Sequence, residues 1–214
     1  MKNASGEAEK DGTTMEKYIV KHTDNVELAD EAFVGDWPWG YSYEPRVSFR
    51  ICHTDDRLIV RLRAYESDPV ARIDRKHGPV CNDSCMEFFF SPSRDNSAGY
   101  FNFEVNSGPT YLFEYGLTTG PDRVYIDGDD DPVPVCTRGE DGFGPFWQID
   151  VSISYSLIRR YVPGATLSSG DVIRGNVYKC GCTDQPDHYG SWSHVDTPGP
   201  NFHKPEFFGE FIIE

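Results

Sequence analysis

The sequence lacks a long apolar segment and is poor in positive charge. No stretch approaches the roughly 18 consecutive apolar residues that a membrane-spanning helix requires, so we expect no membrane span. Lysine and arginine together number 20 against 35 aspartates and glutamates, which gives a formal net charge of −15. Such a surface repels phosphate backbones and anionic lipids, and we therefore expect neither nucleic acid nor a membrane as a partner.

The beginning of the chain also lacks the apolar core of a secretory signal. Residues 1–16 are polar and small, and we predict a disordered tail there. As the chain stands this favours a cytoplasmic protein, and an extracellular one if a leader is missing. Residues 17–214 have a suitable length for a single domain, and we expect a monomer.

Two catalytic signatures are missing as well. The chain has no Gly-x-Ser-x-Gly nucleophile elbow and no Gly-x-x-x-x-Gly-Lys phosphate loop. Nucleophilic and nucleotide chemistry therefore have no support in the sequence.

Aromatic residues, by contrast, are abundant at 14%, and 20 glycines and 15 prolines supply many turns. In residues 100–106 Phe101, Phe103 and Val105 alternate with polar residues, which is the period of a strand with one buried face. Residues 85–90 form a second predicted strand, and 91–99 have turn composition. We predict an all-β fold, an antiparallel β-sandwich of immunoglobulin-like or jelly-roll-like type, with one short helix over 154–161.

The polar face of this predicted hairpin is a candidate ligand surface. Asn102 and Glu104, with Glu87 on the neighbouring strand, could hold sugar hydroxyls, or they could form an ordinary solvated face. Arg61 and Arg63 are predicted to pair with these carboxylates. Two carboxylates on adjacent strands also leave open a glycoside hydrolase that uses Glu87 and Glu104.

Tryptophan supplies the candidate stacking surfaces. Trp192 is flanked by small polar residues, which favours an exposed ring that stacks on a ligand. Trp37 and Trp39 lie in a ring-dense loop and either form a second platform or close the open end of the sandwich.

Two segments contain residue types that can bind metal ions. The acidic run containing Asp127, Asp129 and Asp131 could bind calcium through oxygen ligands, although such runs are usually only solvated. Cys180 and Cys182 have downstream histidines, as in zinc sites, but their spacing is too short and no second matched pair exists. We expect the six cysteines to be mostly reduced and buried on strands.

The segments 82–89 and 100–106, together with 174–180, 188–192 and 201–209, resemble the family 9 carbohydrate-binding modules, in particular their stand-alone, DOMON-like β-sandwich relatives. The resemblance runs in order from about residue 17 to the end of the chain. It implies a non-catalytic module that binds a mono- or oligosaccharide, in some members with structural calcium but with no required cofactor. By the same resemblance, Trp192 is one stacking platform, and Glu87, Asn102 and Glu104 hold hydroxyl groups.

The chain departs from the family pattern in one place. Residues 79–81 are Pro-Val-Cys where the family has a second platform tryptophan, and one extra residue separates Ser84 from Glu87. Either Trp37 or Trp39 takes the missing place, or sugar affinity falls. Three hypotheses follow: a carbohydrate-binding protein, a glycan-active hydrolase, and a structural protein with a vestigial sugar site.

Overall fold

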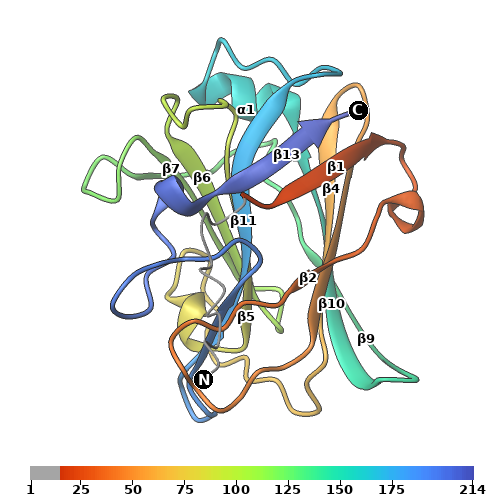
Figure 1. Cartoon of the computed structure of the whole chain (residues 1–214), viewed down its shortest axis with the longest axis vertical. Coiled ribbons are helices and arrows are strands. Elements are labelled where there is room, and N and C mark those ends of the chain that lie inside the picture. Colours follow the sequence, from red (N-terminus) through yellow and green to blue (C-terminus); the bar gives the residue numbers. More distant parts are fainter. Residues whose placement is uncertain (1–14) are drawn as a thin grey trace, which may run out of the picture.

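The computed structural model describes residues 15–214 and consists almost entirely of strands (Figure 1). Most of the expected tail, residues 1–14, lies outside the described part of the chain. In chain order the strands are β1 (Lys17–His22), β2 (Ala32–Val34), β3 (Val47–His53), β4 (Arg57–Ala64), β5 (Cys85–Ser91), β6 (Tyr100–Asn106), β7 (Tyr111–Gly116), β8 (Val124–Tyr125), β9 (Val135–Asp141), β10 (Gly144–Ser154), β11 (Val172–Gly181), β12 (His188–Ser191) and β13 (Gly209–Ile213).

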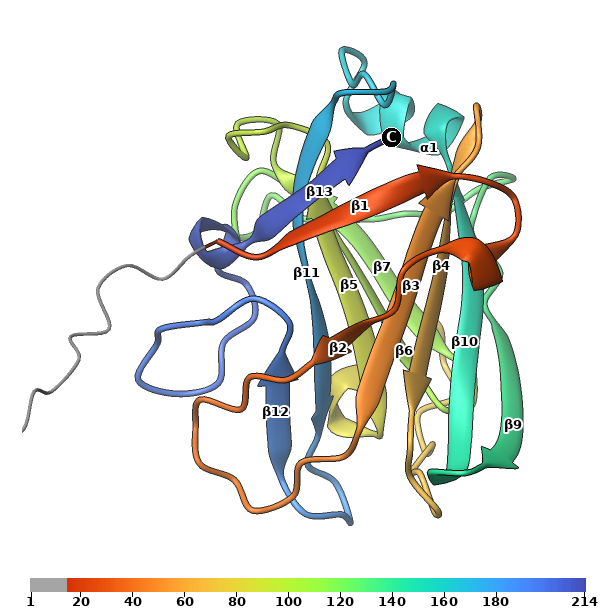
Figure 2. The ribbon, with the colours of Figure 1, turned by 45° about the vertical axis from the view of Figure 1, so that its right-hand side comes forward.

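These strands form two curved sheets that face each other across the core (Figure 2). The first sheet runs in the order β8-β7-β6-β5-β11-β13, with β12 paired to β11. The second runs β3-β4-β10-β9, with β2 paired to β3. The predicted all-β sandwich is thus confirmed.

The pairing departs from the antiparallel prediction at β1. Its first part, Lys17 to Val20, pairs in parallel with β13, and Lys21 and His22 pair in parallel with β3. One strand therefore joins both sheets at a corner of the sandwich.

The predicted hairpin is present and carries the centre of the core. β5 and β6 are antiparallel, and Phe88 lies opposite Phe103 in the register. Phe101, Phe103 and Val105 are completely buried between the sheets, as the alternation predicts. Burying each such side chain stabilises the fold by about 1.5–3 kcal/mol, so this hairpin is a major part of the core.

The predicted helix is α1 (Tyr155–Tyr161), which closes one end of the sandwich. Ser154 caps it, because its hydroxyl oxygen accepts a hydrogen bond of 3.1 Å from the backbone N–H of Leu157. Leu157 and Ile158 anchor the helix in the core. Three short 3-10 segments, Val26–Leu28, Val80–Asn82 and Pro205–Phe207, complete the elements, and within residues 15–214 no helix is long and apolar enough to span a membrane.

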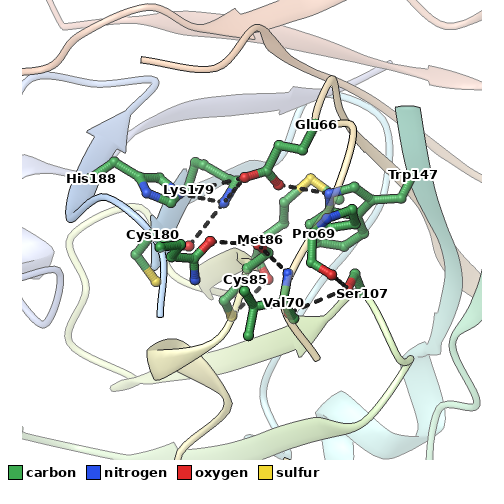
Figure 3. Close-up of polar contacts among 12 residues, drawn as sticks. Glu66, Pro69, Val70, Cys85, Met86, Ser107, Trp147, Lys179, Cys180 and His188 are labelled. Carbon is green, nitrogen blue, oxygen red and sulfur yellow. Dashed lines mark hydrogen bonds and ion pairs between the residues drawn. The ribbon is translucent and has the colours of Figure 1, made fainter. Parts of the chain in front are cut away.

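A buried polar network links the two sheets (Figure 3). The ammonium of Lys179 on β11 lies 3.3 Å from a carboxylate oxygen of Glu66, which follows β4. The other oxygen of Glu66 accepts a 2.7 Å hydrogen bond from the indole of Trp147 on β10. Lys179 also donates to the imidazole of His188 at 2.6 Å. Burial, and then the charge of Lys179, lowers the pKa of His188 to about 4, so the ring is neutral and can accept this bond.

Candidate binding site

The polar face of β5 and β6 does not meet open solvent. Asn102 is completely buried, and the exposed fractions of Glu87 and Glu104 are only 2% and 5%. Residues from two connecting segments, 80–82 and 193–208, pack with the outer rings of these strands in a second apolar cluster. The sequence pattern identified the outward face of these strands correctly but not that loops would cover it.

A pocket of about 210 Å³ remains between this face and the covering segments. Its floor includes Glu87 from β5, Glu104 from β6 and Cys180 from β11. Its other lining residues come from Val80–Asn82, from β12 and from the segment before β13: Cys81, Tyr189, Pro200, Asn201, Phe202 and His203. The pocket therefore combines carboxyl groups with aromatic walls.

Glu87 and Glu104 are direct neighbours on the pocket floor. They lie opposite each other in the β5–β6 register, which places their Cβ atoms about 4.5–5.5 Å apart. Burial raises the pKa of Glu87 well above its usual range, and the nearby Cys180 and Glu104 add to this. Burial likewise raises the pKa of Glu104 to about 7, against the opposing effect of a hydrogen bond from Asn102. Glu104 can therefore exchange between donor and acceptor roles near neutral pH, whereas burial favours the protonated, hydrogen-donating form of Glu87.

Asn102 links the pocket floor to a cation that the sequence analysis missed. Its amide nitrogen donates to Glu104 at 3.0 Å and to Glu114 at 3.4 Å, and its amide oxygen accepts from Arg123. The Arg123 guanidinium also lies 4.2 Å from the centroid of the Tyr100 ring. No local signal marked Arg123, because it precedes a two-residue strand, β8, and reaches this face only through the fold.

His203 lines the wall of the pocket, and its surroundings in the fold set its protonation state. Its Nδ1 lies 2.8 Å from the hydroxyl oxygen of Tyr100. Burial, and then the positive charge of Arg123, lowers the pKa of His203 to about 4. With the ring neutral, Nδ1 can accept the hydrogen of Tyr100, and in that tautomer Nε2 carries a hydrogen and is a donor.

Trp39 supports the wall of the pocket without lining it. Its indole N–H donates to the carbonyl oxygen of Thr197 at 3.0 Å, and its ring lies 5.9 Å from that of Phe202, a lining residue. Phe202 is in turn stacked on Tyr178, with ring centroids 4.1 Å apart and planes 10° apart. The predicted role of Trp39 as a stacking platform is thus not supported, and its contacts hold the covering segment in place.

The predicted exposed platform at Trp192 is wrong. The exposed fraction of this residue is 9%, and its ring packs between the sheets, 4.8 Å from Phe211 and 5.7 Å from Phe49. The reason is the backbone: the Trp192 N–H donates to the carbonyl of Val177, which continues the β12–β11 pairing by one residue. Strand alternation then turns the indole inward, and Gly209 leaves room for it.

Arg61 is also remote from the pocket. It lies on β4 in the second sheet, where it pairs with Asp150 at 2.6 Å and with Glu27. Arg63, on the same face, binds Gln148 at 2.6 Å. The prediction that these arginines pair with Glu87 and Glu104 is therefore wrong, because alternation placed them on the outer face of the opposite sheet.

Basic side chains of the same chain pair with the carboxylates of the acidic loop. The ammonium of Lys76 lies 2.5 Å from a carboxylate oxygen of Asp127 and also binds Asp131. Arg160 binds Asp130 at 2.5 Å. These carboxylates do not fit a calcium cage while Lys76 stands between them, so the expectation of calcium at Asp127, Asp129 and Asp131 gains no support and stays a prediction.

Comparison with known proteins identifies the type of module. The family model described as carbohydrate-binding family 9 matches residues 20–130 and 144–213. No curated protein matches the chain. Among solved structures, a candidate carbohydrate-binding protein from Bacteroides uniformis is 26% identical, with a TM-score of 0.80, over 94% of this chain and 100% of that one.

Two further solved structures share the fold at lower identity. Both are family 9 carbohydrate-binding modules from Caldicellulosiruptor kristjanssonii, one in complex with glucose and one with cellotriose. The glucose complex is 11% identical with a TM-score of 0.64, over 93% of this chain and 96% of that one. The cellotriose complex is 12% identical with a TM-score of 0.63, over 93% and 94%.

Proposed function

The chain belongs to carbohydrate-binding family 9, and from this premise we propose that its pocket over β5, β6 and β11 binds one sugar unit, free or at the end of an oligosaccharide. The observation that carries the proposal is the pairing of Glu87 and Glu104 on the floor of a pocket with aromatic walls. At about 210 Å³ the pocket is smaller than the roughly 300–1,000 Å³ typical of drug-sized ligands, which suits a single ring.

The chemistry of the floor suits neutral hydroxyl groups. A sugar hydroxyl both donates and accepts, and a carboxyl group close to its pKa offers both complementary roles. Neutral His203 adds a donor at the wall, and the rings of Tyr189 and Phe202 provide apolar surface for sugar C–H groups. Binding in this pocket uses no tryptophan, in contrast to the platform expected at Trp192.

Calorimetric titration of the full chain tests the proposal, with glucose and cellotriose as the first ligands because the two Caldicellulosiruptor kristjanssonii modules hold them. A small polar site predicts a Kd of about 10 μM to 1 mM, or about −7 to −4 kcal/mol. A wider panel of mono- and oligosaccharides follows if neither binds.

Glu104→Gln and Tyr189→Ala should each weaken binding at least tenfold, about 1.4 kcal/mol. Glu140→Gln makes the same carboxyl-to-amide change on exposed β9 and should leave the affinity unchanged. Wild-type affinity in both pocket variants, or no binding across the panel, would refute the assignment.

Glycoside hydrolysis is a second candidate function, favoured by the separation of Glu87 and Glu104. Retaining enzymes place two carboxyl groups about 5–5.5 Å apart. A cross-strand pair, whose Cβ atoms lie about 4.5–5.5 Å apart, can hold its carboxyl groups at that spacing. We rank it second because burial moves both groups toward the neutral form, which weakens the nucleophile. The third hypothesis, a vestigial site, rests on the buried Trp192, but the carboxyl groups gathered in a separate pocket favour binding.

A further inference from the structure

Four of the six cysteines gather beside the pocket, where β5 and β11 meet the segment Val80–Asn82. Cys85 on β5 lies directly opposite Cys180 on β11. Cys81 lines the same pocket, and the thiol of Cys180 donates to its carbonyl oxygen at 3.4 Å. Cys182 follows at the end of β11, with its sulfur 3.6 Å from the side-chain oxygen of Asn82. All four are free thiols. The sheet thus brings Cys81 and Cys85 close to Cys180 and Cys182, which lie about 95 residues later in the sequence.

Three ligand atoms in this cluster converge. The sulfurs of Cys85 and Cys180 and a carboxylate oxygen of Glu87 all lie within 4.8 Å of one another, and all three residues are buried. The Cys180 sulfur is 3.1 Å from Oε1 of Glu87. Around a tetrahedral zinc ion, with Zn–S near 2.3 Å and Zn–O near 2.1 Å, neighbouring ligand atoms stand about 3.5–3.8 Å apart. The S–O distance of 3.1 Å and the 4.8 Å limit on the three ligand-atom distances lie on either side of this spacing.

The cluster is also reachable. Glu87 and Cys180 both line the pocket, so one side of the three-ligand set faces its interior. We propose that Cys85, Glu87 and Cys180 bind a zinc ion, or a similar thiophilic divalent cation, whose fourth coordination position opens into the pocket. Three protein ligands with one open position is the arrangement of zinc sites that bind water or a ligand oxygen.

The donor set decides which metals fit. Two sulfurs favour zinc and other soft cations and disfavour calcium and magnesium, which take oxygen ligands. Each bound thiol must lose its proton, and Glu87 loses its own if it is protonated, so zinc binding releases protons to solvent through the pocket. Because zinc displaces these protons, its affinity should increase with pH.

The sequence pattern argued against zinc, because the spacing of Cys180 and Cys182, which have histidines downstream, is too short. The structure separates these histidines: His188 binds Lys179, His194 binds Asp36 and His203 binds Tyr100. The candidate set instead takes Cys180 with two residues of β5, which only the β5–β11 pairing places beside it.

The test uses the full chain, stripped of metal with a chelator and kept reduced with a phosphine. Titration with zinc against a chromogenic chelator should show one site per chain, and cobalt(II) should give a thiolate-to-metal charge-transfer band. Cys180→Ser and the isosteric Glu87→Gln should each weaken zinc binding at least tenfold. Cys182→Ser should not, because its sulfur faces Asn82 and lies outside the three-ligand set.

No zinc uptake, a cobalt spectrum without the charge-transfer band, or an equal loss in Cys182→Ser would each overturn the site. Thermal unfolding of the metal-free variants controls for misfolding, and Glu87→Gln keeps the test valid if Cys180→Ser fails to fold. Sugar titrations with and without zinc are read separately. A failed zinc titration leaves sugar binding standing, and the absence of sugar binding leaves the metal site standing.

Discussion

Lys179 and Glu66 form an ion pair that is sealed between the two sheets. Their charged atoms lie 3.3 Å apart, and the side chains are 0% and 4% exposed. Burying such an ion pair costs free energy. Removing only one partner strongly destabilises the protein, because the charge that remains is buried without a partner or solvent. It joins β11, which carries the pocket residue Cys180 on its other face, to the end of β4 and to Trp147.

Removing one member of this pair should destabilise the protein. Lys179→Met leaves the carboxylate of Glu66 buried without its cation, and we expect a loss of about 3–5 kcal/mol in the free energy of unfolding. The double variant Lys179→Met/Glu66→Gln removes both charges and keeps an acceptor for Trp147, so it should recover at least half of that loss. Urea denaturation of wild type and both variants measures this. A double variant no more stable than the single one would contradict the account.

Trp192 should matter for stability rather than for sugar recognition. Trp192→Ala removes a buried ring that packs against Phe49 and Phe211, and we expect a loss of about 3–5 kcal/mol. Trp192→Phe keeps much of the volume and should cost less. Calorimetric titration at low temperature, where the variants stay folded, should give wild-type sugar affinity. Selective loss of binding in a fully folded Trp192→Phe protein would restore the stacking role predicted from the sequence.

The lowered pKa of His203 predicts that the stability of the protein depends on pH. Its pKa is lowered from 6.5 to about 4 in the folded chain, so between these values the unfolded chain binds more protons. The stabilising contribution is therefore fully present above about pH 6.5 and is lost as the pH falls toward about 4. His203→Gln should lose less stability over this window than wild type does. Urea midpoints at several pH values measure it, and identical slopes for the two proteins would show that His203 does not titrate as described.

Catalysis by the carboxyl pair can be measured directly. If the pocket only binds sugar, neither aryl-glycosides nor oligosaccharides should be turned over above the background rate, and this is the outcome that we expect. If turnover occurs, the hydrolase hypothesis requires it to fall by orders of magnitude in Glu87→Gln and in Glu104→Gln. Activity that persists in both variants would assign the turnover to another group or to a contaminant.

Calcium removal should have little effect on the acidic loop. Lys76 already pairs with Asp127 and Asp131, and Arg160 pairs with Asp130. We therefore expect a calcium chelator to change the Tm by less than the roughly 2–4 °C that corresponds to 1 kcal/mol in a protein of this size. A larger fall that added calcium reverses would revive the predicted calcium site there, and Asp129→Asn should then abolish the effect.

Local patterns predicted the parts of the fold that depend on neighbours in the sequence. Alternation over residues 100–106 identified the buried row of Phe101, Phe103 and Val105 and the polar row opposite. The cap at Ser154 predicted α1, and the two predicted strands marked Glu87 and Glu104 as candidate ligand groups. These signals are readable because a strand or a helix repeats at a period that side-chain chemistry follows.

The same patterns failed where position depended on distant segments. Trp192 has small polar neighbours, yet the pairing of its backbone with Val177 turns the indole into the core. Arg61 alternates correctly to an outer face, but the face belongs to the second sheet. Arg123 carries no motif and reaches Asn102 only because β8 pairs with β7 at the edge of the first sheet.

The sequence by itself determined an all-β chain, the hairpin at its centre, the capped helix and the carboxyl groups that face away from the core. Only the tertiary structure decided that loops cover this polar face and leave a pocket, and that Cys85 lies beside Cys180. It also decided that Trp192 packs in the core. The reason is physical: alternation records which side of a strand a residue takes, whereas what covers that side is set by contacts between segments far apart in the chain.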